Sequence, residues 1–251
     1  MEKEMKVLFI GNSYTFYYDM PEALFYPMMQ EAGVQLSVER ITKGSQRLIN
    51  SANPEDVLGE KVDAALKNHS YDLVILQEQS LLPLAQPGAF YDGVRRLYAR
   101  IRGIGAKAFL YSTWSRKEGS NELVKRGLTC QEMTERLAAG YTAIGEELGI
   151  PVAYVGKAFS YVIEACGDRV ELYNEDKSHP SYAGSFLAAL TLTAAVTGKD
   201  PTDLKYLGEL DVETAGILKA AARRAVMEPV VIPEKYQTRS EGVVYVPEEN
   251  Q

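Results

Sequence analysis

Residues 7–13 spell VLFIGNS: four apolar side chains, Val7 to Ile10, are followed by Gly11, Asn12 and Ser13. A continuous apolar run that ends at a glycine is typical of a central parallel strand, because such a strand is buried on both faces. In open α/β sheets the ligand site lies at the carboxyl ends of the strands. The stretch therefore predicts an α/β fold and places Ser13 at the edge where ligands bind.

The same alternation of short apolar runs and longer amphipathic ones continues along the chain. Further strands are expected at 34–40, 72–76, 107–113 and 151–155, and helices at 20–33, 54–68, 88–103, 129–148, 156–166, after Pro180 and at about 211–227. Asn53 is a candidate N-cap, and Pro180 is expected in the first turn of its helix. This order implies a central parallel sheet of about five strands with helices on both faces. We expect one domain, residues 1–227, and a tail, residues 228–251.

The composition excludes several classes of protein. Of the 251 residues, 27 are Lys or Arg and 34 are Asp or Glu, which gives a formal net charge of −7, and 46% are hydrophobic. These values favour a soluble globular protein and argue against disorder and against attraction to nucleic acid or anionic lipid. Neither a secretory signal nor a long apolar stretch is evident in this sequence, so we expect a cytoplasmic protein without a membrane segment.

The two cysteines and two histidines limit the possible chemistry. Cys130 and Cys166 match no zinc or redox spacing, and His69 and His179 are too few for a His-rich metal site. We therefore expect neither a metal nor a cofactor.

Ser13, Asp176 and His179 together suggest nucleophilic catalysis. A serine hydroxyl needs a base to take its proton, and the base must be held in one tautomer by a carboxylate. Asp176 lies three residues before His179 on a turn that enters a helix. The alternatives are a helix-capping Ser13 and a surface histidine, with Glu175 and Asp168 as rival orienting carboxylates. His69 lies at a polar helix end, where a surface role is favoured.

These residues resemble the SGNH (GDSL-type) hydrolases. The resemblance rests on Gly11-Asn12-Ser13, on a glycine after the second strand and on Asp176-x-x-His179, and it spans residues 5–197. The phrases VLFIGNSYTF, LQEQS and DKSHPSYAGSFLAA are similar to a bacterial subgroup of unknown function. The resemblance implies a flavodoxin-like three-layer α/β/α sandwich, with Ser13 as nucleophile, His179 as base and Asp176 as orienting acid.

The resemblance also implies an oxyanion hole. The family uses the N–H of the serine, the N–H of a glycine and an asparagine amide, and the first two would be those of Ser13 and Gly44. The asparagine block after the third strand is absent, and LQEQS stands there instead. Gln77 is the expected replacement, because its amide can donate the same hydrogen bond, and Gln79 is the alternative. Both could also serve only to order the loop.

Three residues are candidates for the substrate pocket: Asn12, Tyr14 and Trp114. Asn12 replaces the family's first-block aspartate and is expected to support the site. Trp114, the only tryptophan, is expected first to fill the core and second to line a sugar or acyl pocket. The predicted function is a serine esterase that removes a small acyl group, with acetyl favoured, from a small-molecule substrate such as an acylated sugar. The alternatives are an inactive carbohydrate-binding relative, a lysophospholipase or a thioesterase.

Overall fold

The computed structural model of the chain describes residues 4–247 and is built on a parallel sheet. Five strands, all paired in parallel, follow the order β2-β1-β3-β4-β5. Their bounds are β1 Met5–Gly11, β2 Leu36–Thr42, β3 Leu73–Gln77, β4 Lys107–Tyr111 and β5 Val152–Ala153. The predicted α/β fold with a five-stranded parallel sheet is confirmed.

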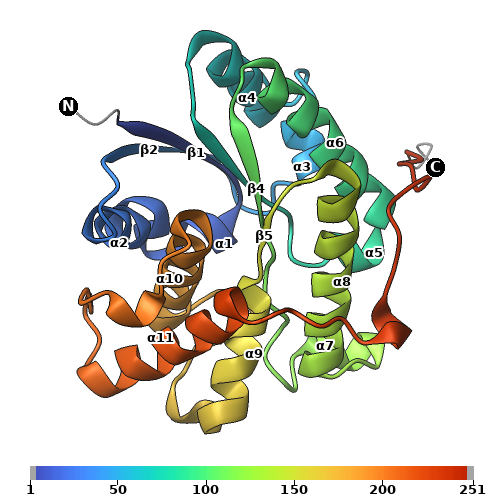
Figure 1. Cartoon of the computed structure of the whole chain (residues 1–251). Helices are drawn as coiled ribbons and strands as arrows, with labels where there is room; N and C mark the ends of the chain where they lie inside the picture. The colour runs from blue at the N-terminus through green and yellow to red at the C-terminus, as the bar shows by residue number, and fades with distance from the viewer. Residues whose placement is uncertain (1–3, 248–251) are drawn as a thin grey trace.

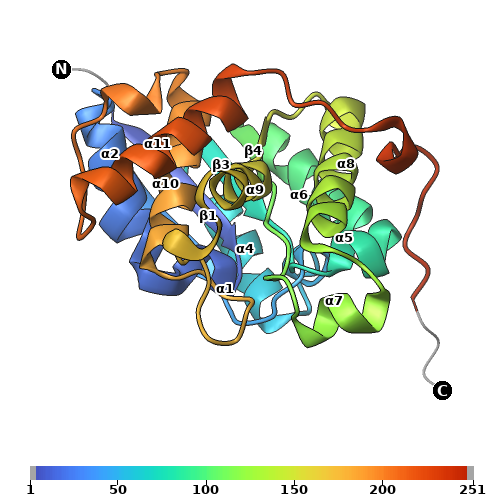
Figure 2. The same cartoon turned by 90° about the horizontal axis from the view of Figure 1, so that it is seen from below.

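The sheet lies between two layers of helices (Figures 1 and 2). One layer holds α2 (Tyr26–Glu31), α9 (Val155–Cys166), α10 (Tyr182–Thr197) and α11 (Val212–Met227), and the other holds α3 (Leu48–Ser51), α4 (Val57–Asn68), α6 (Pro87–Gly103) and α8 (Cys130–Leu148). Along β1, Val7 and Phe9 join the first core, whereas Leu8 and Ile10 join the second. Successive strand residues point to opposite faces, so a strand covered on both sides is apolar throughout.

The chain also forms short helical segments near the carboxyl edge of the sheet. These are α1 Ser13–Phe16, the 3-10 turn Tyr17–Asp19, the π-helical turn Met20–Phe25, α5 Leu82–Ala85 and α7 Asn121–Arg126. The helix predicted over 20–33 is therefore divided between the π-helical turn and α2. Tyr18 and Asp19 before it have positive φ values of 55° and 46°. The short helices α3, α5 and α7 were not predicted from the sequence.

Two predicted helix starts were wrong. The cap of α4 is Asp56, whose Oδ1 accepts hydrogen bonds from the N–H groups of Leu58 at 2.9 Å and Gly59 at 3.1 Å. Asn53 instead closes a local turn with the N–H of Glu55. A carboxylate at a helix N-terminus is also favoured by the helix dipole. The cap of α10 is Ser181, so Pro180 lies before that helix.

The segment after α11 runs across α8 and reaches α6 (Figures 1 and 2). The Arg95 guanidinium on α6 donates to the carbonyl oxygens of Ser240 at 2.7 Å and Val243 at 2.8 Å. The Ser240 hydroxyl donates to Ala143 O on α8. These contacts attach the segment to the helical layer. Residues 248–251 of the predicted tail lie outside the described residues.

Candidate active site

The turn after β1 presents Ser13 at the carboxyl edge of the sheet. Asn12 caps α1 with its side-chain oxygen, which accepts from Tyr14 N–H at 3.1 Å, and its amide donates to Gln46 O at 3.0 Å. The N–H groups of Thr15 and Phe16 bond to Asn12 O. Within residues 4–247, the N–H of Ser13 has no hydrogen-bond partner. It is therefore free to bind an incoming oxygen.

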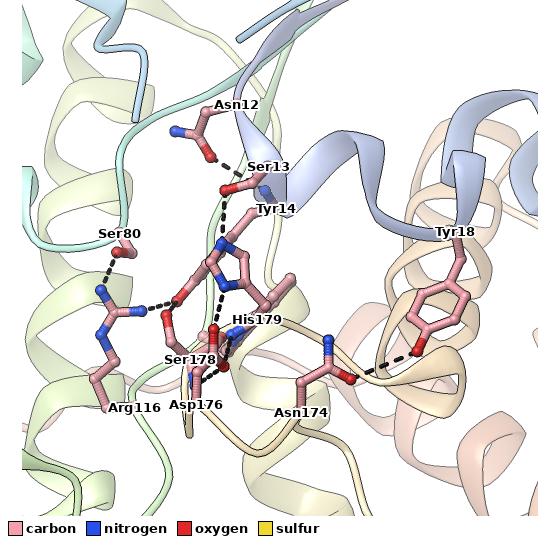
Figure 3. Close-up of polar contacts among 11 residues, drawn as sticks. Asn12, Ser13, Tyr14, Tyr18, Ser80, Arg116, Asn174, Asp176, Ser178 and His179 are labelled. Carbon is pink, nitrogen blue, oxygen red and sulfur yellow. Dashed lines mark hydrogen bonds and ion pairs between the residues drawn. The ribbon is translucent and has the colours of Figure 1, made fainter. Parts of the chain in front are cut away.

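Ser13, His179 and Asp176 form a continuous chain of polar contacts (Figure 3). The Nε2 atom of His179 lies 2.8 Å from Ser13 Oγ, and its Nδ1 atom contacts Asp176 Oδ2. One ring nitrogen therefore faces the hydroxyl and the other faces a carboxylate. This arrangement allows the ring to accept the serine proton while the carboxylate stabilises the resulting positive charge.

Asp176 also shapes the turn that carries the histidine. Its Oδ1 accepts from the N–H groups of Ser178 at 3.0 Å and His179 at 2.9 Å. Partial burial pushes the pKa of the Asp176 carboxyl up, but the hydrogen bonds from the His179 ring and these N–H groups outweigh burial and hold the pKa below its usual value. The acid therefore stays ionised at neutral pH. Lys177 inside the turn has a φ of 57°.

The two other carboxylates considered for orienting His179, those of Asp168 and Glu175, lie away from its ring. Asp168 pairs with Lys117 at 3.2 Å, and Glu175 is exposed. In the described part of the chain, neither contacts the His179 ring. His69, the other histidine, is exposed at the end of α4.

Aromatic rings fix the plane of the His179 imidazole. Tyr17 stacks on it, with ring centroids 4.5 Å apart and planes 10° apart. Tyr14 meets it edge-on at 5.7 Å. Packing from two sides limits rotation of the ring and keeps Nε2 directed at Ser13.

The structure does not support the predicted oxyanion role of Gln77. Its amide nitrogen donates to Asn12 Oδ1 at 3.0 Å and to Glu78 O, and its carbonyl oxygen accepts from Asn12 N–H and Thr15 Oγ1, both at 2.9 Å. Both N–H bonds of a primary amide are then used, and so are both lone pairs of its oxygen. Gln77 is buried, and its hydrogen bonds to Asn12 and Thr15 hold the turn that carries Ser13.

The position of Gly11 requires a glycine, because the Gln77 side chain approaches its backbone closely. A Cβ at this position would lie 2.6 Å from Gln77 Oε1 and 2.7 Å from Thr15 Oγ1. The glycine of the Gly-Asn-Ser motif thus makes room for the hydrogen-bonded glutamine.

Glu78, which the sequence analysis did not single out, is completely buried. Its carboxyl accepts from the N–H of Leu48 at 3.1 Å and from its neighbour Gln79 at 2.6 Å, and so ties the segment after β3 to the start of α3. Burial raises the pKa of Glu78 to about 8, although those two N–H groups and the charge of Arg47 act in the opposite direction. Its position inside LQEQS could have indicated a role, but only the fold reveals its partners.

The other predicted oxyanion donors retain free N–H groups. The Gln79 side-chain oxygen accepts from Leu81 N–H at 2.8 Å and Leu82 N–H at 3.0 Å, while its amide nitrogen makes one long contact of 3.5 Å with Ser80 Oγ. Gly44 is exposed, and within residues 4–247 no hydrogen bond uses its N–H.

Two of the predicted pocket residues are buried supports. Trp114 is completely buried in a stack between Tyr14 and Phe159, at 4.4 Å from each, and its Nε1 donates to Ser178 O at 3.0 Å. It therefore fills the core and supports the turn that carries His179. Asn12 is 2% exposed and bonds to groups of the Ser13 turn and to Gln46 O, and its supporting role stays a prediction.

Tyr14 and Arg116 form a second polar group beside the triad (Figure 3). Tyr14 Oη lies 3.0 Å from Ser178 Oγ and accepts from Arg116 Nη1, while Arg116 Nη2 donates to Ser80 Oγ at 2.9 Å. Arg116 lies in the polar segment that follows β4, but no role was predicted for it.

Two further properties follow from residues 4–247. No group of three His, Cys, Asp or Glu side chains in that range is placed to hold a metal ion. None of its helices combines the length and the apolar character needed to cross a membrane.

Comparison with known proteins identifies related structures. No protein-family model and no curated protein matches the chain. A candidate SGNH hydrolase from Slackia heliotrinireducens is 32% identical, with a TM-score of 0.67, over 77% of this chain and 100% of that one. A DUF4886 family protein from Bacteroides uniformis is 20% identical, with a TM-score of 0.76, over 92% of this chain and 98% of that one.

More distant similarity extends to enzymes of known activity. The acetylxylan esterase of Geobacillus stearothermophilus is 16% identical, with a TM-score of 0.52, over 80% of this chain and 98% of that one. At this level of identity the comparison shows a shared fold.

Proposed function

The chain belongs to the SGNH hydrolase family, and from this membership we propose that it is a serine esterase whose nucleophile is Ser13. The observation that carries the proposal is the contact of His179 with Ser13 Oγ on one side and with Asp176 on the other. These are the contacts that serine activation requires.

In the proposed first step, His179 Nε2 takes the proton of Ser13 Oγ while the oxygen attacks the ester carbonyl. Asp176 stays ionised and stabilises the imidazolium. The imidazolium then gives its proton to the leaving alcohol, and an acyl group remains on Ser13. Water, deprotonated by the same ring, attacks the acyl-enzyme, and the acid and free Ser13 are released.

The oxyanion hole proposed here uses the N–H groups of Ser13 and Gly44 and the amide of Gln79. The first two have no hydrogen-bond partner within the described residues, and the Gln79 amide makes one long contact. Gln77 is left out because both of its N–H bonds are used. Donors that are fixed before the reaction stabilise the developing charge without reorganisation.

The proposed substrate is an ester of a small acyl group, with acetyl favoured, on a carbohydrate. The shared fold with an acetylxylan esterase supports this choice. The proposed steps need only side chains and backbone groups of the chain itself.

The test is hydrolysis of p-nitrophenyl acetate and of acetylated sugars by the protein and by Ser13→Ala. We expect turnover that Ser13→Ala abolishes, and covalent labelling of Ser13 by an organophosphonate probe. If the probe labels Ser13 but acetyl esters are not hydrolysed, the substrate is a longer acyl ester or a thioester.

A weakly active or inactive carbohydrate-binding protein is the second candidate. The hydrogen bonds of Gln77 favour this second candidate, because both N–H bonds of the amide that was predicted to stabilise the oxyanion are already used. Absence of both turnover and labelling, with retained binding of an acetylated sugar, would establish it.

A further inference from the structure

Arg116 places a positive charge beside the triad, and no described carboxylate forms an ion pair with it. Among residues 4–247, no ion pair includes this side chain. Its guanidinium is half-buried and bonds to two neutral oxygens, Tyr14 Oη and Ser80 Oγ. A guanidinium carries five N–H bonds, so three have no partner in the described part of the chain.

The position of Arg116 is fixed from three directions. Ser80 comes from the segment after β3, Tyr14 follows the nucleophile, and the Arg116 backbone N–H lies 3.5 Å from Met133 Sδ. Figure 3 shows the guanidinium on one side of the Ser13–His179–Asp176 line, with Ser80 and the Tyr14 hydroxyl at its tip. A planar donor fork held in place loses little freedom when it binds an anion.

A cavity of about 450 Å³ adjoins this side chain. Its wall includes Arg116, Ser120, Asn121, Asp176, Lys177 and Ser178. The cavity therefore borders the orienting acid of the triad and is large enough for part of a sugar ring and its substituents.

The other charges of the wall decide what kind of anion fits. Lys177 Nζ donates to Gly119 O at 3.1 Å, Glu122 contacts Arg126 at 3.7 Å, and Asp176 is bonded within its turn. Glu175 also lines the wall and is exposed. With three carboxylates nearby, a dianionic phosphate is repelled more strongly than a single carboxylate, whose two oxygens match the guanidinium fork.

We propose that Arg116 binds a carboxylate of the substrate, so that the preferred substrate is an acyl ester of a sugar acid. The inference rests on the proposed esterase activity and narrows its substrate class. Arg116 acts in binding and selects the alcohol part of the ester, while Ser13 and His179 carry out the reaction.

The test compares two acetyl esters that differ in one group: an O-acetylated methyl glucuronide and the matching O-acetylated methyl glucoside. We expect kcat/KM to favour the acid by about tenfold to a hundredfold, since hydrogen bonds to charged groups have this range of effect. Arg116→Gln should bring the ratio close to one, mainly through KM, and Arg116→Lys should restore part of it. Added salt should lower the wild-type ratio.

Arg96→Gln is the matched control, because it removes an arginine charge from the exposed face of α6. It should leave the ratio unchanged. Equal hydrolysis of the two esters by the wild-type protein, or an unchanged ratio in Arg116→Gln, would overturn the inference. A preference for a phosphorylated sugar ester over the acid would also overturn it.

Direct binding separates this inference from the esterase proposal. In the Ser13→Ala background, titration calorimetry should show methyl glucuronide binding more tightly than methyl glucoside, and Arg116→Gln should remove the difference. If Ser13 is unreactive but this difference is present, the esterase proposal fails and the carboxylate site stands. If Ser13 reacts and the difference is absent, the esterase stands and the carboxylate site fails.

Discussion

Two polar segments at the carboxyl edge of the sheet have opposite surroundings. The turn from Asp176 to His179 is half-exposed. Asp176 bonds within the turn and His179 reaches the Ser13 hydroxyl, while Tyr14 and Trp114 bond to Ser178. The segment from Gln77 to Glu78 is buried, and its side chains bond to groups 30 to 65 positions away as well as to the adjacent Glu78 O and Gln79 N–H. A polar group can act on a substrate only where the fold leaves one of its bonds unused. In the second segment the bonds of the Gln77 amide are all used to hold the Ser13 turn, whereas the first segment brings the His179 ring to the Ser13 hydroxyl.

Ser13→Ala should have the largest effect. Removal of the nucleophile should lower kcat on p-nitrophenyl acetate by a factor on the order of 10⁴ or more, because the residues of a triad act as a unit. The melting temperature should stay within about 2 °C of wild type, since among residues 4–247 the hydroxyl bonds only to His179. If Ser13→Ala keeps a kcat within tenfold of wild type, Ser13 is not the nucleophile.

Asp176→Asn should have the next largest effect. An amide at this position can still accept from the turn N–H groups, but it cannot stabilise an imidazolium, and it favours the wrong tautomer of His179. We expect kcat to fall by a factor on the order of 10² to 10⁴. Steady-state kinetics measure it, with Glu175→Gln as the control that should leave kcat unchanged. A loss in the control equal to that in Asp176→Asn would make Glu175 the orienting acid.

Gln77→Ala and Gln79→Ala distinguish a glutamine that stabilises the fold from one that takes part in catalysis. Gln77→Ala leaves the N–H of Asn12 and the hydroxyl of Thr15 without their partner, so the free energy of unfolding should fall by about 2–4 kcal/mol. Gln79→Ala should lower kcat by a factor on the order of 10² and change stability less. Urea denaturation and initial rates measure the two quantities.

The reverse result would restore the role first predicted for Gln77. A Gln77→Ala protein of wild-type stability whose kcat is strongly reduced would mean that its amide faces the substrate.

Glu78→Gln is expected to have the smallest effect on activity, and its effect on stability depends on pH. The pKa of Glu78 is raised to about 8 in the folded chain from 4.5, so between these values the folded state keeps a proton that the unfolded state has released. The free energy of unfolding then falls as pH rises through this window, by up to about 1.4 kcal/mol per pH unit. Glu78→Gln lacks this contribution. From pH 5 to pH 8, the free energy of unfolding should therefore fall more for wild type than for the variant. Identical pH slopes in urea denaturation would contradict the assignment.

Local patterns in the sequence predicted the strands and the longer helices, and they singled out Ser13, Asp176 and His179 as candidates. The apolar run of β1 marks a doubly covered strand, and the three-residue spacing from Asp176 to His179 is short enough for the turn itself to bring the side chains together. The roles of Ser13, Asp176 and His179 remain predictions, and the contacts among them are those that the predictions require.

Partners distant in sequence account for what was missed. Gln77 looked free because Asn12 and Thr15, which occupy its amide, lie more than 60 residues earlier. Trp114 could have lined a pocket until the fold placed it between Tyr14 and Phe159. The significance of Arg116 depends on the fact that, within residues 4–247, none of the carboxylates near it forms an ion pair with it, which its neighbours in the sequence do not reveal.

The most direct test of the central claim is covalent labelling by an organophosphonate probe followed by intact-mass and peptide analysis. We expect one label per chain, on Ser13, with labelling strongly slowed in His179→Ala and absent in Ser13→Ala. A label on another residue, or turnover of acetyl esters by a protein whose Ser13 does not react, would contradict it.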